Sequence, residues 1–244
     1  MTMRTVLRAL SVRLDPEQTS AAFAASSLML RYPDESLMES LDPLTTLSGQ
    51  LPGNFGKPFR DMCAYLSDHS LLDSQALYVA TFDLKRRCCL YLSYYLNGDT
   101  RRRGMALWRF QDAYRSAGQQ VTQGELPDYL PALLEFAATG GLQPATQLMN
   151  EHRAGILVLL EALEEMASPY AGIVRAVDSL LPPRADRVIS DAERLVYEGP
   201  PSELVGIDDV EAFEPYATQI SCESCATTEA FGAVATDPAD LERP

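Results

Sequence analysis

The sequence predicts an all-α protein, a single helical-bundle domain followed by a disordered acidic tail. Apolar residues recur at helical spacing through the first 200 residues, and no stretch alternates apolar and polar residues as a strand would. From residue 200 to the last residue there are ten acidic residues, one basic residue and five prolines. We therefore expect an N-terminal extension (1–14), an all-helical domain (15–198) and a flexible acidic tail (199–244).

Charge and composition exclude several classes of protein. The net charge of −14 argues against non-specific nucleic-acid binding, because that binding depends on basic residues that neutralise phosphates. Apolar runs fall well short of the roughly 18 residues of a membrane span, and arginines interrupt the first 14 residues as they would not in a secretory signal. We expect a cytoplasmic protein without stable membrane association. Five cysteines, with Cys88 and Cys89 adjacent, indicate reduced thiols.

Helix start and stop signals divide the first third of the chain. Asp15 followed by proline predicts a helix that ends at Tyr32, before Pro33. A short helix should run from Asp34 to Leu41 and end at the next aspartate–proline pair. Three glycines and two prolines mark residues 49–58 as a loop, and helical spacing predicts a further helix over 58–68.

The middle of the chain predicts the most buried helix. After a helical pattern from Ser74 to Phe82, residues 84–96 are apolar on nearly all sides, which is typical of a central helix. Asn97-Gly98 supplies a left-handed stop, and Asp99 should cap a helix over 100–117. So short a connection predicts two antiparallel helices.

Four more helices are expected. They span residues 128–138, a long run from 144 to 166, 168–180 and a marginal segment over 186–197. In the first of them, Asp128, Ala132 and Glu135 should share one face. That arrangement would place two carboxylates together on a face of small residues.

Two charged clusters are candidate sites. Arg101, Arg102 and Arg103 lie in the first turn of a predicted helix, where the helix dipole disfavours positive charge. Arg103 follows the buried stripe and should join helices through a bidentate pair with a carboxylate, while Asp99 helps to neutralise the cluster. Exposed Arg101 and Arg102 are candidates for contact with an anion or a partner.

Glu125, Pro127 and Asp128, with Glu135 two turns further on, form the acidic counterpart. These carboxylates could hold a positively charged segment of a partner, or they could cap the helix and neutralise the arginines. Both interpretations remain open from the residues alone.

Catalytic and metal sites are not expected. Cys222 and Cys225 form a CxxC pattern with only two ligands and no histidine, which is too few for a structural zinc site. His69 and His152 are isolated, and no phosphate-binding glycine motif is present. The residues therefore favour a binding protein without catalytic residues, metal or bound cofactor over an enzyme.

Four ordered motifs resemble the NarJ family of nitrate reductase molybdenum cofactor assembly chaperones. They are Tyr78-Val79-x-Thr81-Phe82-Asp83, Leu90-x-Leu92-x-Tyr94, Gly98-Asp99-x-Arg101-x-Arg103-Gly104 and Glu125-Leu126-Pro127-Asp128-Tyr129-Leu130-Pro131. The resemblance implies the all-helical fold of the TorD-like chaperones of redox-enzyme maturation. It also implies binding to the apo catalytic (alpha) subunit of respiratory nitrate reductase, including its N-terminal segment, so that molybdenum cofactor is inserted before membrane docking.

In the related chaperones the corresponding acidic motif lies in the groove for the client peptide. The resemblance therefore implies that Glu125, Pro127, Asp128, Tyr129 and Glu135 bind the client, with transient contact to molybdenum cofactor delivery proteins. The alternative is a carrier that grips the phosphate of a cofactor or nucleotide with the Arg101–Arg103 cluster.

Overall fold

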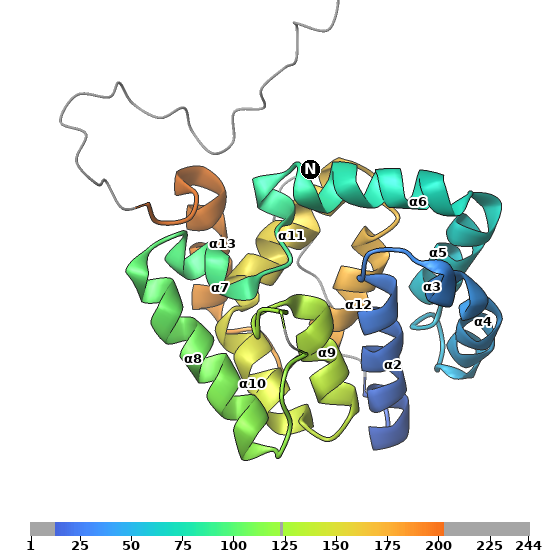
Figure 1. Cartoon of the computed structure of the whole chain (residues 1–244), viewed down its shortest axis with the longest axis horizontal. Coiled ribbons are helices and arrows are strands. Elements are labelled where there is room, and N and C mark those ends of the chain that lie inside the picture. Colours follow the sequence, from blue (N-terminus) through green and yellow to red (C-terminus); the bar gives the residue numbers. More distant parts are fainter. Residues whose placement is uncertain (1–12, 123, 203–244) are drawn as a thin grey trace, which may run out of the picture.

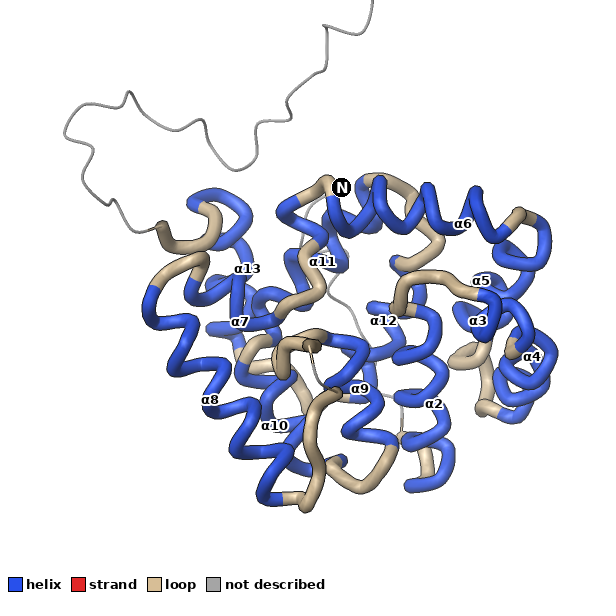
Figure 2. Tube along the Cα trace, in the orientation of Figure 1, coloured by secondary structure: helices blue, strands red, loops and turns tan. Residues whose placement is uncertain are grey.

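The computed structural model describes residues 13–122 and 124–202, and this part of the chain is helical with no strand (Figures 1 and 2). The first half contains α2 (Pro16–Met29), α3 (Glu35–Glu39), α4 (Leu41–Gln50), α5 (Lys57–Asp68), α6 (Leu71–Tyr78), a π-helix (Val79–Asp83) and a 3₁₀ turn (Arg86–Cys88). The second half contains α7 (Leu92–Asn97), α8 (Arg101–Ser116), α9 (Leu130–Ala138), α10 (Leu142–Glu151), α11 (Arg153–Glu165), α12 (Ala171–Leu180) and α13 (Asp186–Glu198). The predicted all-α class is confirmed for these residues.

The core forms around α11, which is buried along almost its whole length. This helix packs against α10, α12 and α13, while α2 packs against α9 and α12. Close approach requires a glycine at 155, because a Cβ there would lie 2.6 Å from the ring of Tyr95 on α7. On one side of this core α8 forms an outer layer beside α10 (Figure 1).

The predicted central helix over 84–96 is wrong. Only α7, at its end, is α-helical, and residues 89–91 are extended. The backbone there pairs with the segment before α9: Leu92 N–H donates to the carbonyl of Asp128, and Leu130 N–H donates to that of Leu90. A short apolar run is compatible with either a buried helix or a buried extended segment, so periodicity could not distinguish them.

The predicted run from 144 to 166 is two helices rather than one. Its backbone leaves helical geometry at His152 (φ −101°, ψ 15°), between α10 and α11. The break lets α10 contact α8 and α9 while α11 enters the core. Arg153 then makes a buried ion pair with Asp178 of α12, with 2.8 Å between Nε and Oδ1.

Helix α4 was missed and the cap of α8 was misplaced. The proline at 43 lies in the first turn of α4, where it removes no intrahelical hydrogen bond, so it does not stop a helix. Thr100 rather than Asp99 is the N-cap residue of α8, and its side chain makes no capping bond. Gly98 has the positive φ that the predicted stop requires (55°), but its ψ of −154° lies outside the left-handed helical region. The division into domains and the tail from 203 onward lie beyond what the described residues test.

Candidate functional site

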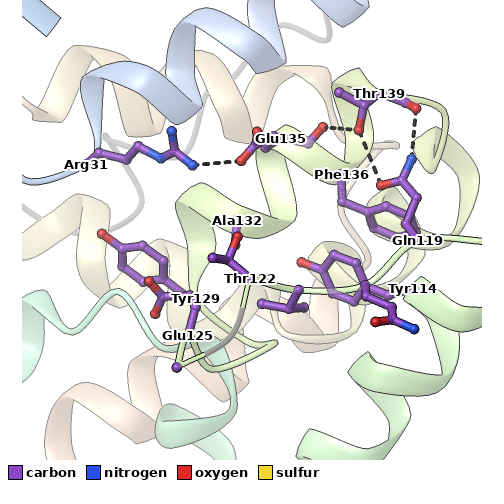
Figure 3. A pocket seen from close by; sticks show the side chains of 13 residues that line it. Arg31, Tyr114, Gln119, Thr122, Glu125, Tyr129, Ala132, Glu135, Phe136 and Thr139 are labelled. Atoms are coloured by element: carbon purple, nitrogen blue, oxygen red, sulfur yellow. Dashed lines mark hydrogen bonds and ion pairs between the residues drawn. The ribbon is translucent and has the colours of Figure 1, made fainter. Parts of the chain in front are cut away.

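The motif residues from 125 to 135 border a groove of about 470 Å³ (Figure 3). One wall is α9, the opposite wall is the loop after α8, and Arg31 closes one end. The lining residues are Arg31, Tyr114, Gln119, Gln120, Val121, Thr122, Gly124, Glu125, Tyr129, Ala132, Glu135, Phe136 and Thr139.

The wall formed by α9 follows from its amphipathic pattern. Its leucines are buried against the core, whereas Ala132, Glu135 and Thr139 recur at i, i+3 and i+7 and border the groove. Gln119 fastens the opposite loop to the end of this helix, because its Nε2 donates to the carbonyl of Thr139 at 2.8 Å. Helix and loop are thereby held as two facing walls.

The rim carries an ion pair that sequence reasoning did not anticipate. Arg31 lies just after α2, and its Nη2 is 2.7 Å from Oε2 of Glu135. Both side chains are about half exposed, at 46% and 52%. Exposed pairs of this kind contribute about 0–1 kcal/mol, so an incoming charged group could replace either partner at small cost. Glu125 adds a second carboxylate to the groove.

The interior of the groove holds a buried hydroxyl without a protein partner. The Tyr114 ring stacks on Phe136 with 4.3 Å between centroids, and its hydroxyl points into the groove (Figure 3). The side chain is only 4% exposed, and burial raises the pKa of Tyr114, so the hydroxyl stays protonated. A buried hydroxyl left unpaired costs about 1–3 kcal/mol. Because this oxygen is shielded from solvent, a groove wall has to shift before the acceptor of a ligand can reach it and remove that cost.

Tyr129 is held at the other end of the groove by a tyrosine pair. Its hydroxyl is 3.1 Å from that of Tyr78, which also donates to the carbonyl of Leu30 at 3.2 Å. Burial raises the pKa of Tyr129. The ring of Tyr129 is 5.3 Å from that of Tyr91, where burial and then the charge of Glu125 raise the pKa to about 12. These hydroxyls are therefore neutral donors near pH 7.

Asp128 does not share a face with Glu135, because α9 begins two residues later. Its side chain is completely buried and accepts hydrogen bonds from Ser93, at 3.1 Å from the backbone N–H and 2.5 Å from Oγ. The predicted pair of carboxylates on one helix face is thus corrected: Glu135 faces the groove, and Asp128 fixes the segment before α9 to the start of α7. Burial prevents Asp128 from contacting a partner in this conformation.

Arg103 joins the same buried cluster. Its Nη1 is 3.0 Å from Asp99 and its Nη2 is 3.8 Å from Asp128, and its guanidinium lies about 6 Å from the rings of Tyr91 and Tyr94. The predicted tie between helices is present, but it is divided between two carboxylates rather than bidentate to one.

The candidate residues therefore separate into three places. Glu125, Tyr129 and Glu135 meet in the groove, and Pro127 lines a neighbouring hollow on the other side of the loop. Arg103 and Asp128 belong to the buried cluster, with the exposed Asp99 paired to Arg103 at its edge, and Arg101 and Arg102 are exposed on α8 away from the groove. Sequence reasoning missed Arg31 and Tyr114, since nothing local to either residue indicates that the fold brings them together.

The described residues contain no group of three or more histidine, cysteine or acidic side chains placed to hold a metal ion. Within the same residues no helix is long and apolar enough to cross a membrane. Cys63, Cys88 and Cys89 are free thiols, as predicted, and burial raises the pKa of Cys88 to about 11. Cys222 and Cys225 lie outside the described residues.

Comparison with known proteins identifies relatives of this chain. The family model "Nitrate reductase delta subunit" matches residues 48–175. The probable nitrate reductase molybdenum cofactor assembly chaperone NarJ of Bacillus subtilis is 30% identical over 159 residues, which cover 64% of this chain and 85% of that protein. Escherichia coli K12 NarJ, the nitrate reductase molybdenum cofactor assembly chaperone, is 32% identical over 59% of this chain and 63% of its own length.

Two further proteins are similar to part of this chain. The nitrate reductase-like protein NarX of Mycobacterium tuberculosis H37Rv is 37% identical over 62% of this chain, but the chain spans only 23% of it. A crystal structure of a putative redox enzyme maturation protein from Archaeoglobus fulgidus superposes with a TM-score of 0.48 at 22% identity, covering 70% of this chain and 96% of that one. From the family model and the NarJ relatives, the chain belongs to the nitrate reductase delta subunit family and to its NarJ-type chaperones.

Proposed function

We propose that this protein is an assembly chaperone for respiratory nitrate reductase. In this proposal it binds the apo catalytic subunit, including its N-terminal segment, and keeps it competent for insertion of the molybdenum cofactor before the enzyme docks at the membrane. The names of the NarJ relatives support the general role. The groove beside α9 supplies a place for a client segment, and its partnerless Tyr114 hydroxyl is the observation that carries the assignment.

The chemistry of the groove selects a cationic amphipathic segment. Stacked Tyr114 and Phe136 offer an apolar surface, and Glu125 and Glu135 offer negative charge at the rim. An amphipathic helix could lay its apolar face on the rings while its basic side chains reach the carboxylates. A carbonyl or hydroxyl of the same segment would accept a hydrogen bond from Tyr114.

Arg31 gives this rim a simple exchange mechanism. A basic residue of the client would displace Arg31 from Glu135, and the released guanidinium could bind an acidic group or the carbonyls at the C-terminal end of a client helix. Because these charges are half exposed, salt should screen them and weaken binding. A binding constant unchanged by salt would contradict the electrostatic half of the proposal.

Asp128 takes a different role from the one the family resemblance implied. Because Asp128 is buried and bonded to Ser93, it would position the groove wall rather than touch the client. Replacement of Asp128 would then disturb binding and stability together. Replacement of Glu125 would disturb binding alone.

Calorimetry with a peptide of the client's N-terminal segment tests the groove directly. Glu125→Gln and Glu135→Gln should each weaken binding about 2- to 10-fold, as expected for loss of a charged contact worth about 0.5–1.5 kcal/mol. Glu39→Gln, an equally charged change at an exposed position on α3, should leave affinity unchanged. If the wild type and the three variants bound the peptide with equal affinity, the peptide would not bind in this groove.

A separate pull-down tests the client itself. Retention of one large molybdoenzyme subunit would support the proposal, and its absence would count against the chaperone assignment. The alternative of a cofactor or nucleotide carrier depends on Arg101–Arg103, and it is weakened because Arg103 is engaged by Asp99 and Asp128. Molybdopterin that co-purifies with the protein would support the carrier alternative.

A further inference from the structure

The outward face of α8 carries large apolar side chains and arginines, and it lies outside the groove. Met105 and Trp108 are 74% and 58% exposed, and they lie one turn apart. Exposed arginines flank them at 102, 109 and 115, of which Arg109 already pairs with Glu151 of α10 at 2.8 Å. Helix α8 carries five arginines and one acidic residue, whereas the whole protein has a net charge of −14.

The end of the described chain lies at the start of this face. After α13 the backbone passes so close to the α7–α8 turn that a Cβ at Gly98 would lie 1.7 Å from the carbonyl oxygen of Pro201. Figure 1 shows this last described segment beside the first turn of α8. Whatever follows residue 202 therefore starts next to Arg101 and Arg102.

The residues that follow complement the face in charge and in apolar content. Between 203 and 214 there are five acidic residues and no basic residue. Leu204, Ile207, Val210 and Phe213 recur every third residue among these acids. The segment thus offers apolar groups for Met105 and Trp108, and carboxylates for the arginines that flank them.

We propose that residues 203–214 dock on the outward face of α8 and cover Met105 and Trp108. The distance allows it, since Arg101 and Trp108 are separated by about 10 Å along the helix axis. Ten residues span about 15 Å as a helix and about 33 Å when extended, so either conformation reaches Trp108. Covalent connection gives the segment an effective concentration of about 1 mM, which makes even a weak contact populated.

Trp108 reports on this contact without any label, because it is the only tryptophan in the sequence. Acrylamide quenching of its fluorescence should be compared between the full chain and a chain that ends at Ser202. A contact with a dissociation constant of about 1 mM would be half formed at that effective concentration, so quenching in the full chain should be about twofold weaker. Emission should also lie at shorter wavelength in the full chain. Equal quenching in the two proteins would overturn the proposal.

Two charge variants of the full chain locate the contact. Neutralising the near acids by Asp208→Asn, Asp209→Asn, Glu211→Gln and Glu214→Gln should expose Trp108 as fully as truncation does. The control carries the same change in charge further on, at Glu229→Gln, Asp237→Asn, Asp240→Asn and Glu242→Gln, and should keep Trp108 protected. Equal loss of protection in both variants would contradict docking by residues 203–214.

The oligomeric state separates docking of the tail from contact with a second copy. Protection of Trp108 should be independent of protein concentration, and sedimentation should show the same oligomeric state for the full and truncated chains. Protection that increases with concentration in the truncated chain would assign the face to a second copy and overturn the proposal. This test does not use the client, so its result is independent of the proposed chaperone function.

Discussion

Replacing Tyr114 by phenylalanine should stabilise the protein while weakening its hold on the client. The ring, which stacks on Phe136, is retained, and only the hydroxyl is lost. That hydroxyl is buried without a protein partner in the free chain. Its removal should raise the free energy of unfolding by about 1 kcal/mol, at the low end of the 1–3 kcal/mol range for an unsatisfied polar group. For a domain of this size, the melting temperature should rise by about 2–4 °C.

The same substitution should weaken binding of the client, although it stabilises the free protein. A hydrogen bond from Tyr114 to the client would contribute about 0.5–1.5 kcal/mol, so Tyr114→Phe should raise the dissociation constant about 2- to 10-fold. Calorimetry with the client peptide and thermal unfolding of the free protein measure the two effects separately. A single substitution that changes stability and affinity in opposite directions is hard to attribute to misfolding.

Two other tyrosines serve as controls. Tyr170 also has a buried hydroxyl without a protein partner, but it packs against Phe82 away from the groove. Tyr170→Phe should therefore give a similar gain in stability and no change in affinity. The Tyr78 hydroxyl is bonded to Leu30, so Tyr78→Phe should lower stability by about 1 kcal/mol. If Tyr114→Phe lowered stability as Tyr78→Phe does, the hydroxyl would be satisfied in the free protein and the reasoning would fail.

Three further predictions concern the scaffold. Asp128→Ala should lower the unfolding free energy by about 3 kcal/mol in urea titrations, because it leaves the two buried Ser93 donors unpaired and Arg103 with Asp99 as its remaining carboxylate. Asp99→Ala should cost less than about 1 kcal/mol, because that carboxylate is exposed. Equal losses would contradict the buried cluster. Burial raises the pKa of the Cys88 thiol to about 11. As the pH rises, the unfolded chain therefore loses this proton before the folded chain does, and the stability that the protonated thiol contributes below pH 9 is lost as the pH approaches 11. From pH 9 to 11 the wild type should lose about 2 kcal/mol more than Cys88→Ala, and parallel curves would show that the thiol does not contribute. Gly118→Ala should lower the free energy of unfolding by about 1–2 kcal/mol, because its backbone has a positive φ and the added Cβ meets no other atom. Gly98→Ala should lower it further in thermal unfolding, because a backbone carbonyl also blocks the added Cβ. Equal losses would mean that the segment after α13 moves away freely.

Local signals were enough to place many helix ends. Asp15 caps α2 in a capping box, as its aspartate–proline sequence predicted, and Gly98 stops α7. Both rules depend on residues within one turn of the helix end, and such residues are adjacent in the sequence. The same rules failed at His152 and over 84–96, where the partner that decides the conformation is distant in sequence.

The candidate site was predicted in part for the same reason. Glu125 and Glu135 lie near each other in the chain, and the motifs marked both. Arg31 lies just after α2 and Tyr114 lies in α8, so only the packing of these elements around α9 brings them to the groove. Pattern alone could not show that Asp128 is buried, because a carboxylate that precedes a helix is equally suited to solvent and to an internal bond with Ser93.

By itself the sequence determined the helical class, the family and the residues that carry its motifs, since helical periodicity, capping and motif spacing are properties of neighbouring residues. Tertiary structure alone decided that α11, rather than residues 84–96, is the central helix. It also decided that Asp128 faces inward, that Glu135 faces outward, and that Tyr114 lines the groove. These outcomes depend on which surfaces meet and on which polar groups find partners once water is excluded. That information is distributed over elements far apart in the chain.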